Sequence, residues 1–290
     1  MLEKALLQKP NRLPPPRQRI YTPPKPKGAK TMTVAIGTIG REGIVIGADR
    51  EITHTVNKTR ERKIWTARYS NLSAVVTGAG TWGYLRSACE KIVRVLSAAT
   101  TLDDAQELVQ ETIRAIYGQE IEIDPARLST DPPFFHLVIG VWTPSSYGLI
   151  RSEGTTVTRS SEPRSEFLGV GGPLAERLCT GYLGTILSNK QASIVITNAI
   201  RIVKESVPGC GGPTDTVLLN RDGSIEWDDT RYLDQVARKI EMHIRPLLLA
   251  CTDHEIPESI FNGIIETLRV QGLKLREEEG RETSPTPFGQ

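Results

Sequence analysis

The most constraining feature of the chain is the run TVAIGTIGREGIVIGAD at residues 33–49, in which a polar, glycine-containing turn separates two apolar stretches. Such a run predicts two β-strands that fold back on each other as a hairpin. It closes on Asp49, directly after the apolar stretch. A carboxylate at the end of a buried strand is costly unless it is paired, and a lysine is the obvious partner. Our candidate is Lys63, which precedes Ile64 at the start of the next expected strand.

Thr33 opens this run and directly follows Met32. A threonine hydroxyl is a weak nucleophile unless a base lies beside it. The threonine's own α-amino group, with an unperturbed pKa of about 8, is one such base. That amine exists only where the chain begins at Thr33. Removal of an initiator Met32, or cleavage of a precursor after it, would produce this end.

The sequence divides into a leader at residues 1–32, a main domain at 33–228, a helical extension at 229–276 and a polar tail at 277–290. The leader is rich in Pro, Lys and Arg, so we expect polyproline or disordered structure there. Three interpretations of it stay open: a propeptide that is removed, a tether that is retained, or upstream sequence translated from the wrong start codon. A retained leader would leave Thr33 in mid-chain and disable an amine base.

The order of expected elements predicts an α+β fold, a four-layer α-β-β-α sandwich. Two sheets packed face to face each need a helix pair on their outer side, whereas a doubly wound sheet would alternate strand and helix one by one. Beyond the main domain, residues 232–250 and 257–276 predict two further helices. Within the main domain, the first strands are expected in 33–49, 63–67 and 72–77, followed by helices at 82–99 and 103–117. Further strands are expected at 134–142, 147–152, 155–159 and 166–170, then helices at 173–187 and 192–206, and a final hairpin at 214–219 and 224–227.

Several motifs of the main domain resemble the proteasome β-subunit family. Counted from Thr33, the first hairpin matches the family's opening without a gap, whereas counting from Thr31 would force extra residues into the turn. Lys63 resembles the family's lysine before an apolar residue, and Gly80 lies in a stretch similar to its Ala-Gly-x-x-Gly entry to the first helix. The residues that carry the match are Ile36-Gly37, Gly43, residues 44–49, Lys63-Ile64, residues 74–83 and Gly169-Val170-Gly171-Gly172-Pro173.

This resemblance implies a threonine-type N-terminal nucleophile hydrolase that cleaves peptide bonds. Its catalytic residues would be Thr33 as nucleophile, Asp49 and Lys63 as the charged pair beside it, and the backbone N–H of Gly80 as oxyanion donor. The implied substrates are peptides or unfolded proteins, and the implied assembly is a homo-oligomeric ring. An ATP-driven unfoldase is a weaker implication, and the chain itself has no GxxxxGK[ST] motif.

The sequence also departs from the family pattern. Val170 stands where the family has a turn serine, and Glu205 and Pro208 stand in place of its later aspartate and second serine. A valine side chain cannot form a hydrogen bond. Two alternatives therefore stay open: a catalytically inactive proteasome-like scaffold or ring subunit, and an N-terminal nucleophile amidohydrolase that acts on a small amide.

Composition argues against several other functions. The 36 basic and 34 acidic residues give a formal charge of +2, so the overall balance does not indicate nucleic-acid binding. No apolar stretch is long enough for a membrane span and no signal peptide is evident, so we expect a cytoplasmic protein. The widely spaced cysteines predict neither a metal site nor a disulfide framework, and no cofactor is expected. We expect Cys210 in an exposed turn, and Arg50, Arg60 and Arg62 in a solvated loop.

Overall fold

The computed structural model describes residues 33–53, 58–124, 126, 132–160, 164–180, 182–183 and 187–229, with single positions between 231 and 238. The leader at 1–32, the helix expected at 257–276 and the tail at 277–290 lie outside the described residues. Of the helix expected at 232–250, only positions 233, 235, 236 and 238 are described, and these are helical.

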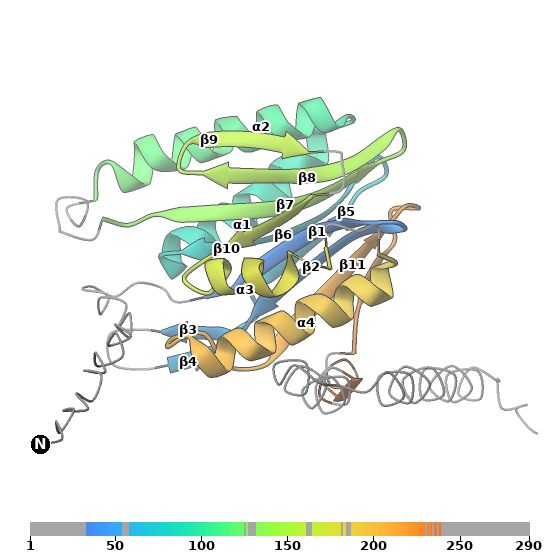
Figure 1. The fold of residues 1–290 in the computed structure, drawn as a ribbon. Helices are drawn as coiled ribbons and strands as arrows, with labels where there is room; N and C mark the ends of the chain where they lie inside the picture. Colours follow the sequence, from blue (N-terminus) through green and yellow to red (C-terminus); the bar gives the residue numbers. More distant parts are fainter. Residues whose placement is uncertain are drawn as a thin grey trace, which may run out of the picture.

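Two five-stranded antiparallel sheets pack face to face, and a helix pair covers each outer side (Figure 1). This arrangement confirms the predicted fold class. The first sheet has the order β10-β1-β2-β11-β12, with strands β10 Ser165–Leu168, β1 Ala35–Gly40, β2 Gly43–Asp49, β11 Thr214–Asn220 and β12 Ile225–Trp227. The second has the order β5-β6-β7-β8-β9, with strands β5 Ile64–Arg68, β6 Ser73–Gly80, β7 Phe135–Thr143, β8 Ser146–Glu153 and β9 Thr156–Ser160.

The helices lie where the apolar periodicity places them. Helices α1 (Trp82–Val95) and α2 (Leu102–Ile116) cover the second sheet, and α3 (Gly172–Cys179) and α4 (Asn189–Ser206) cover the first (Figure 1). Short 3-10 and π segments, Leu96–Ala98 and Tyr117–Ile121, follow α1 and α2. Thr101 and Ser188 begin α2 and α4 with capping boxes, which satisfy backbone N–H groups that a helix start leaves unpaired. The helix expected at 173–187 is shorter than predicted, because α3 ends at Cys179.

Three apolar clusters fill the spaces between the four layers. One lies between α1, α2 and the second sheet and includes Leu85, Ile92 and Ile139. The middle one joins the two sheets through Ile44, Ile46 and Val138. The third lies between the first sheet and α3 and α4. Burial on both faces explains why β1, β2 and β6 consist entirely of buried residues.

A small hairpin between β2 and β5 was not predicted. Strands β3 (Glu51–Thr53) and β4 (Lys58–Arg60) form a separate two-stranded sheet beside the sandwich (Figure 1). Each has only three residues and most of their side chains are polar, so neither carries the alternating apolar pattern of a longer strand.

We predict that Gly37→Ala destabilises the fold by about 1–3 kcal/mol, because a Cβ on Gly37 would lie 2.4 Å from Val138 Cγ1 between the two sheets. Gly83→Ala in α1 is the matched control. Nothing lies within 4 Å of the added Cβ there, so this change should stabilise by about 0.5–1 kcal/mol. Chemical denaturation of both variants measures the difference. Equal effects would contradict the close approach of the sheets at Gly37.

Candidate active site

The β1–β2 hairpin brings the two ends of the run at residues 33–49 together. Pairing of Ala35 with Ala48 places the residues just before β1 opposite the end of β2, and Asp49 N donates to Val34 O at 3.2 Å. Lys63 arrives from the other sheet, immediately before β5. Its carbonyl accepts a hydrogen bond from Thr77 Oγ1 at 2.8 Å, which ties it to the neighbouring strand β6.

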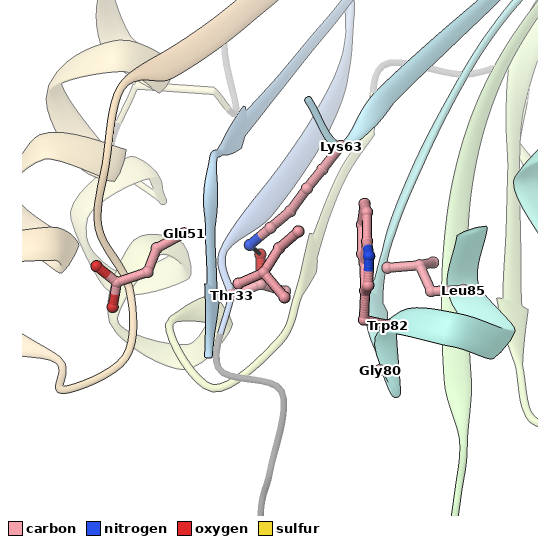
Figure 2. A pocket seen from close by; sticks show the side chains of 7 residues that line it. Thr33, Glu51, Lys63, Gly80, Trp82 and Leu85 are labelled. Atoms are coloured by element: carbon pink, nitrogen blue, oxygen red, sulfur yellow. Dashed lines mark hydrogen bonds between the residues drawn. The ribbon is translucent and has the colours of Figure 1, made fainter. Parts of the chain in front are cut away.

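Thr33, Asp49 and Lys63 form one buried cluster of hydrogen bonds. Lys63 Nζ lies 2.6 Å from Thr33 Oγ1 and 2.9 Å from Asp49 Oδ1, and the Thr33 hydroxyl donates to the same carboxylate oxygen. Figure 2 shows the Lys63 side chain pointing at Thr33. The relative exposures are 2% for Thr33, 0% for Asp49 and 3% for Lys63. The ion pair predicted between Asp49 and Lys63 is therefore present, and it shares the Thr33 hydroxyl.

Backbone groups complete the environment of the Asp49 carboxylate. Val34 N donates to Oδ1 at 3.1 Å, and Gly211 N donates to Oδ2 at 3.0 Å. A carboxylate held by several donors and one ammonium can remain charged away from water.

Burial also acts on the lysine. Desolvation lowers the pKa of Lys63, because the charged form loses its hydration, and the nearby charge of Asp49 opposes part of that shift. The Lys63 ammonium is therefore a stronger acid than that of an exposed lysine, and it contacts the Thr33 hydroxyl. Such an amine can stabilise negative charge that develops on the hydroxyl oxygen.

Gly80 lies at the pocket that opens onto Thr33. It has φ +143°, and a Cβ on it would lie 2.3 Å from the carbonyl oxygen of Phe134, so only glycine fits. Trp82 forms a wall of the same pocket, with its ring 5.9 Å from that of Trp65. The full lining comprises Thr33, Glu51, Ile52, Lys63, Gly80, Trp82 and Leu85 (Figure 2).

The glycine turn before α3 contacts Thr33 through its backbone. Gly171 N donates to Thr33 O at 3.2 Å. Gly169 has φ +84°, and a Cβ there would lie 2.1 Å from Thr33 O, so the turn approaches the threonine closely. Val170 lies between these glycines and is 42% exposed, and its side chain provides no hydrogen bond.

Two residues of the loop between α4 and β11 were not predicted to lie near the site. Cys210, expected in an exposed turn, is instead 5% exposed. Burial raises the pKa of its thiol to about 12, with a smaller contribution from Asp49. The next residue, Gly211, donates to Asp49. The glycines around Cys210 were the available signal, since glycine often marks a close backbone approach.

The two later departures from the family pattern, Glu205 and Pro208, are exposed. Glu205 is on the last turn of α4 with a side chain that is 62% exposed, and it pairs with Arg201 at 3.0 Å. Pro208 is exposed as well. The residue of this segment that donates a hydrogen bond to Asp49 is Gly211, three positions after Pro208.

The structure also bears on metal binding and on membrane-spanning helices. Within the described ranges, no group of three or more His, Cys, Asp or Glu side chains is placed to hold a metal ion. No helix in the part of the chain that the structure describes is long and apolar enough to cross a membrane.

The fold is that of the N-terminal nucleophile hydrolases of the proteasome β-subunit type. Among solved structures it matches Anbu, described for one of them as an ancestral β-subunit. The Yersinia bercovieri protein has a TM-score of 0.65 at 13% identity, with 78% of this chain and 98% of that chain covered. A Gly-1 mutant of Anbu from Hyphomicrobium sp. strain MC1 has a TM-score of 0.63 at 15% identity, with 78% of this chain and 99% of that chain covered. The Anbu complex from Pseudomonas aeruginosa, solved as a helical assembly, has a TM-score of 0.63 at 18% identity, with 78% of this chain and 98% of that chain covered.

No family model matches the sequence, and no curated protein matches it either. Identities of 13% to 18% relate the chain to these structures by fold. The chemistry must therefore be argued from the residues of this chain.

We predict that Lys63 titrates below its ordinary pKa of 10.5 and that Asp49→Asn lowers its pKa further, because the carboxylate favours the ammonium form. The measurement is an NMR titration of the 13Cε resonances of labelled lysine, with Lys63→Met identifying the signal. A higher pKa in Asp49→Asn would contradict the electrostatic role of the pair.

Proposed function

We propose that this chain is a threonine-type N-terminal nucleophile hydrolase that cleaves peptide bonds. The observation that carries the proposal is the hydroxyl of Thr33, which contacts the Lys63 amine at 2.6 Å and the Asp49 carboxylate in a buried cluster. A threonine at the head of a strand is ordinary, but one that shares its hydroxyl with a buried ion pair is not.

The proposed reaction begins with attack of Thr33 Oγ1 on the carbonyl carbon of a peptide bond. The hydroxyl proton passes to the free α-amine of Thr33, which exists once the bond before Thr33 has been cut. Lys63 stabilises the charge that develops on Oγ1, and Asp49 holds Lys63 in place. The leaving amine takes up the proton, and water then hydrolyses the ester that joins the acyl group to Thr33.

Gly80 supplies the proposed donor to the oxyanion. Its backbone lines the pocket onto which Thr33 opens, and its conformation excludes every side chain. A backbone N–H at this place would need no side-chain reorganisation during the reaction.

The surroundings favour a peptide over a small amide. Trp82 lines both the threonine pocket and a second cleft, whose other lining residues are Glu61, Arg62, Trp65, Arg86 and Glu90. This neighbouring cleft, with two aromatic rings and charges of both signs, can accommodate side chains of an extended substrate.

We predict that protein expressed from Met32 loses its methionine and hydrolyses fluorogenic peptides, and that Thr33→Ala abolishes this turnover. Thr33→Ser keeps a hydroxyl and should retain part of it. Protein that retains the leader lacks the amine base, which costs about 10²- to 10⁴-fold. Intact mass and initial rates are the measurements.

The matched control is Thr38→Ala, which removes a buried hydroxyl from β1 that contacts Ser165 and not the candidate site. It should leave the rate unchanged. If protein that begins at Thr33 hydrolyses no peptide or small amide in a Thr33-dependent way, the chain is a non-catalytic scaffold. Turnover of small amides alone would support the amidohydrolase alternative.

We further propose that copies of this chain assemble with one another. The sequence resemblance implies a closed ring, whereas the Anbu complex from Pseudomonas aeruginosa is described as a helical assembly. An ATP-driven unfoldase would be needed to deliver folded substrates, and this partner stays a prediction from the resemblance.

We predict that the purified chain forms a homo-oligomer. Light scattering gives its mass, and electron microscopy distinguishes a closed ring from an open helix. A monomer at micromolar concentration would contradict the assembly proposal without bearing on the chemistry of Thr33.

A further inference from the structure

Arg50 does not lie in a solvated loop as the sequence predicted. Its guanidinium forms two hydrogen bonds with Asp215, from Nε to Oδ2 at 2.7 Å and from Nη2 to Oδ1. The side chain of Asp215 is 4% exposed and that of Arg50 is 28% exposed. The hydrogen bonds to Asp215 raise the pKa of Arg50 further above its already high value. A bidentate arginine–carboxylate pair of this kind fixes the relative orientation of the two side chains as well as their distance.

The segment that Arg50 binds is also the segment that binds Asp49. Residues 211–215 lead from the loop after α4 into β11, where Thr214 pairs with Asp49. The backbone of β2 and β3 holds the same segment, because Arg50 N donates to Pro213 O at 3.0 Å and Glu51 N donates to Gly211 O at 3.1 Å.

Gly211 holds the second oxygen of the Asp49 carboxylate. Asp49 Oδ1 accepts hydrogen bonds from Thr33, Lys63 and Val34. Among the described residues, Asp49 Oδ2 accepts a hydrogen bond from Gly211 N alone. Rotation of the carboxylate would take Oδ1 away from Thr33 and Lys63. The fit at Gly211 is close, because a Cβ there would lie 2.3 Å from Glu51 Oε2.

We propose that Arg50 is a positioning residue for the candidate active site. Through Asp215 it holds residues 211–215 against β2, so that Gly211 N–H keeps the Asp49 carboxylate turned toward Thr33 and Lys63. Arg50 makes no contact with the reacting hydroxyl and acts through this segment. The effect on catalysis rests on the proposed hydrolase function, whereas the effect on Gly211 does not.

The chain offers a matched control in the pair Arg151–Glu166, which links β8 and β10. Arg151 Nη1 lies 2.7 Å from Glu166 Oε2, with side-chain exposures of 30% and 5%, close to those of Arg50 and Asp215. None of the hydrogen bonds or ion pairs described for this pair involves Thr33, Asp49 or Lys63. A purely structural role for Arg50 predicts that the two arginines behave alike.

The first measurement is amide hydrogen exchange at Gly211 in the full chain. Cys210-Gly211 is the only Cys-Gly pair among the 25 glycines of the sequence, so 13C-carbonyl cysteine combined with 15N-glycine selects this amide. We expect Arg50→Lys and Asp215→Asn to speed its exchange at least about tenfold, because the local opening that exposes it becomes easier. Arg151→Lys should leave it unchanged.

The second measurement is peptide hydrolysis by the same proteins. Arg50→Lys and Asp215→Asn should lower kcat by about 10- to 100-fold, the scale of a misplaced reacting group, with KM nearly unchanged. Arg151→Lys should lower thermal stability and leave kcat unchanged. Should Arg50→Lys fail to fold, Asp215→Glu replaces it, since it keeps both charges and shifts the carboxylate.

The outcomes separate the two proposals. Unchanged Gly211 exchange in a folded Arg50 or Asp215 variant would overturn the positioning role, as would equal acceleration by Arg151→Lys. If the wild-type chain shows no Thr33-dependent hydrolysis, the proposed function fails while the exchange experiment still decides how Asp49 is positioned.

Discussion

The buried charge of Asp49 is the constraint on which the rest of the candidate site depends. A carboxylate that no water reaches must be compensated by donors and by an opposite charge. Here four donors come from three chain segments: Thr33 and Val34 before β1, Lys63 directly before β5, and Gly211 in the loop before β11. The need to supply hydrogen bonds and an opposite charge to Asp49 thus fixes where both sheets and the α4–β11 loop meet.

The four-layer architecture was predictable because its signals are local. Apolar stretches, glycine turns and helical periodicity mark the elements one at a time, and their order restricts how two sheets and two helix pairs can stack. The need of Asp49 for a cationic partner was predictable for a similar reason, since the cost of a buried carboxylate is visible in the sequence, and the family resemblance identified Lys63 as that partner. The short β3–β4 hairpin was not, because three mostly polar residues carry no periodicity.

The remaining errors concern residues whose surroundings are set by distant parts of the chain. Arg50 looked like one of several loop arginines, yet its partner Asp215 lies 165 positions away. Cys210 lies in a glycine-rich segment that resembles an exposed turn, but it packs near Gly171 in the apolar cluster between the first sheet and α3 and α4. Composition of a segment does not reveal what packs on top of it, so these two positions needed the folded structure.

The contacts of Thr33 have a consequence for how such a protein would be switched on. Its carbonyl is held by Gly171 and its hydroxyl by Asp49 and Lys63, and all of these groups lie on the carboxyl side or on the side chain of the residue. None of them uses the nitrogen of Thr33. These contacts are present in a chain that still continues upstream, so a cut before Thr33 would add a proton acceptor to contacts that already exist. Under the proposed function, activation would then depend on whether one nitrogen is an amide or an amine.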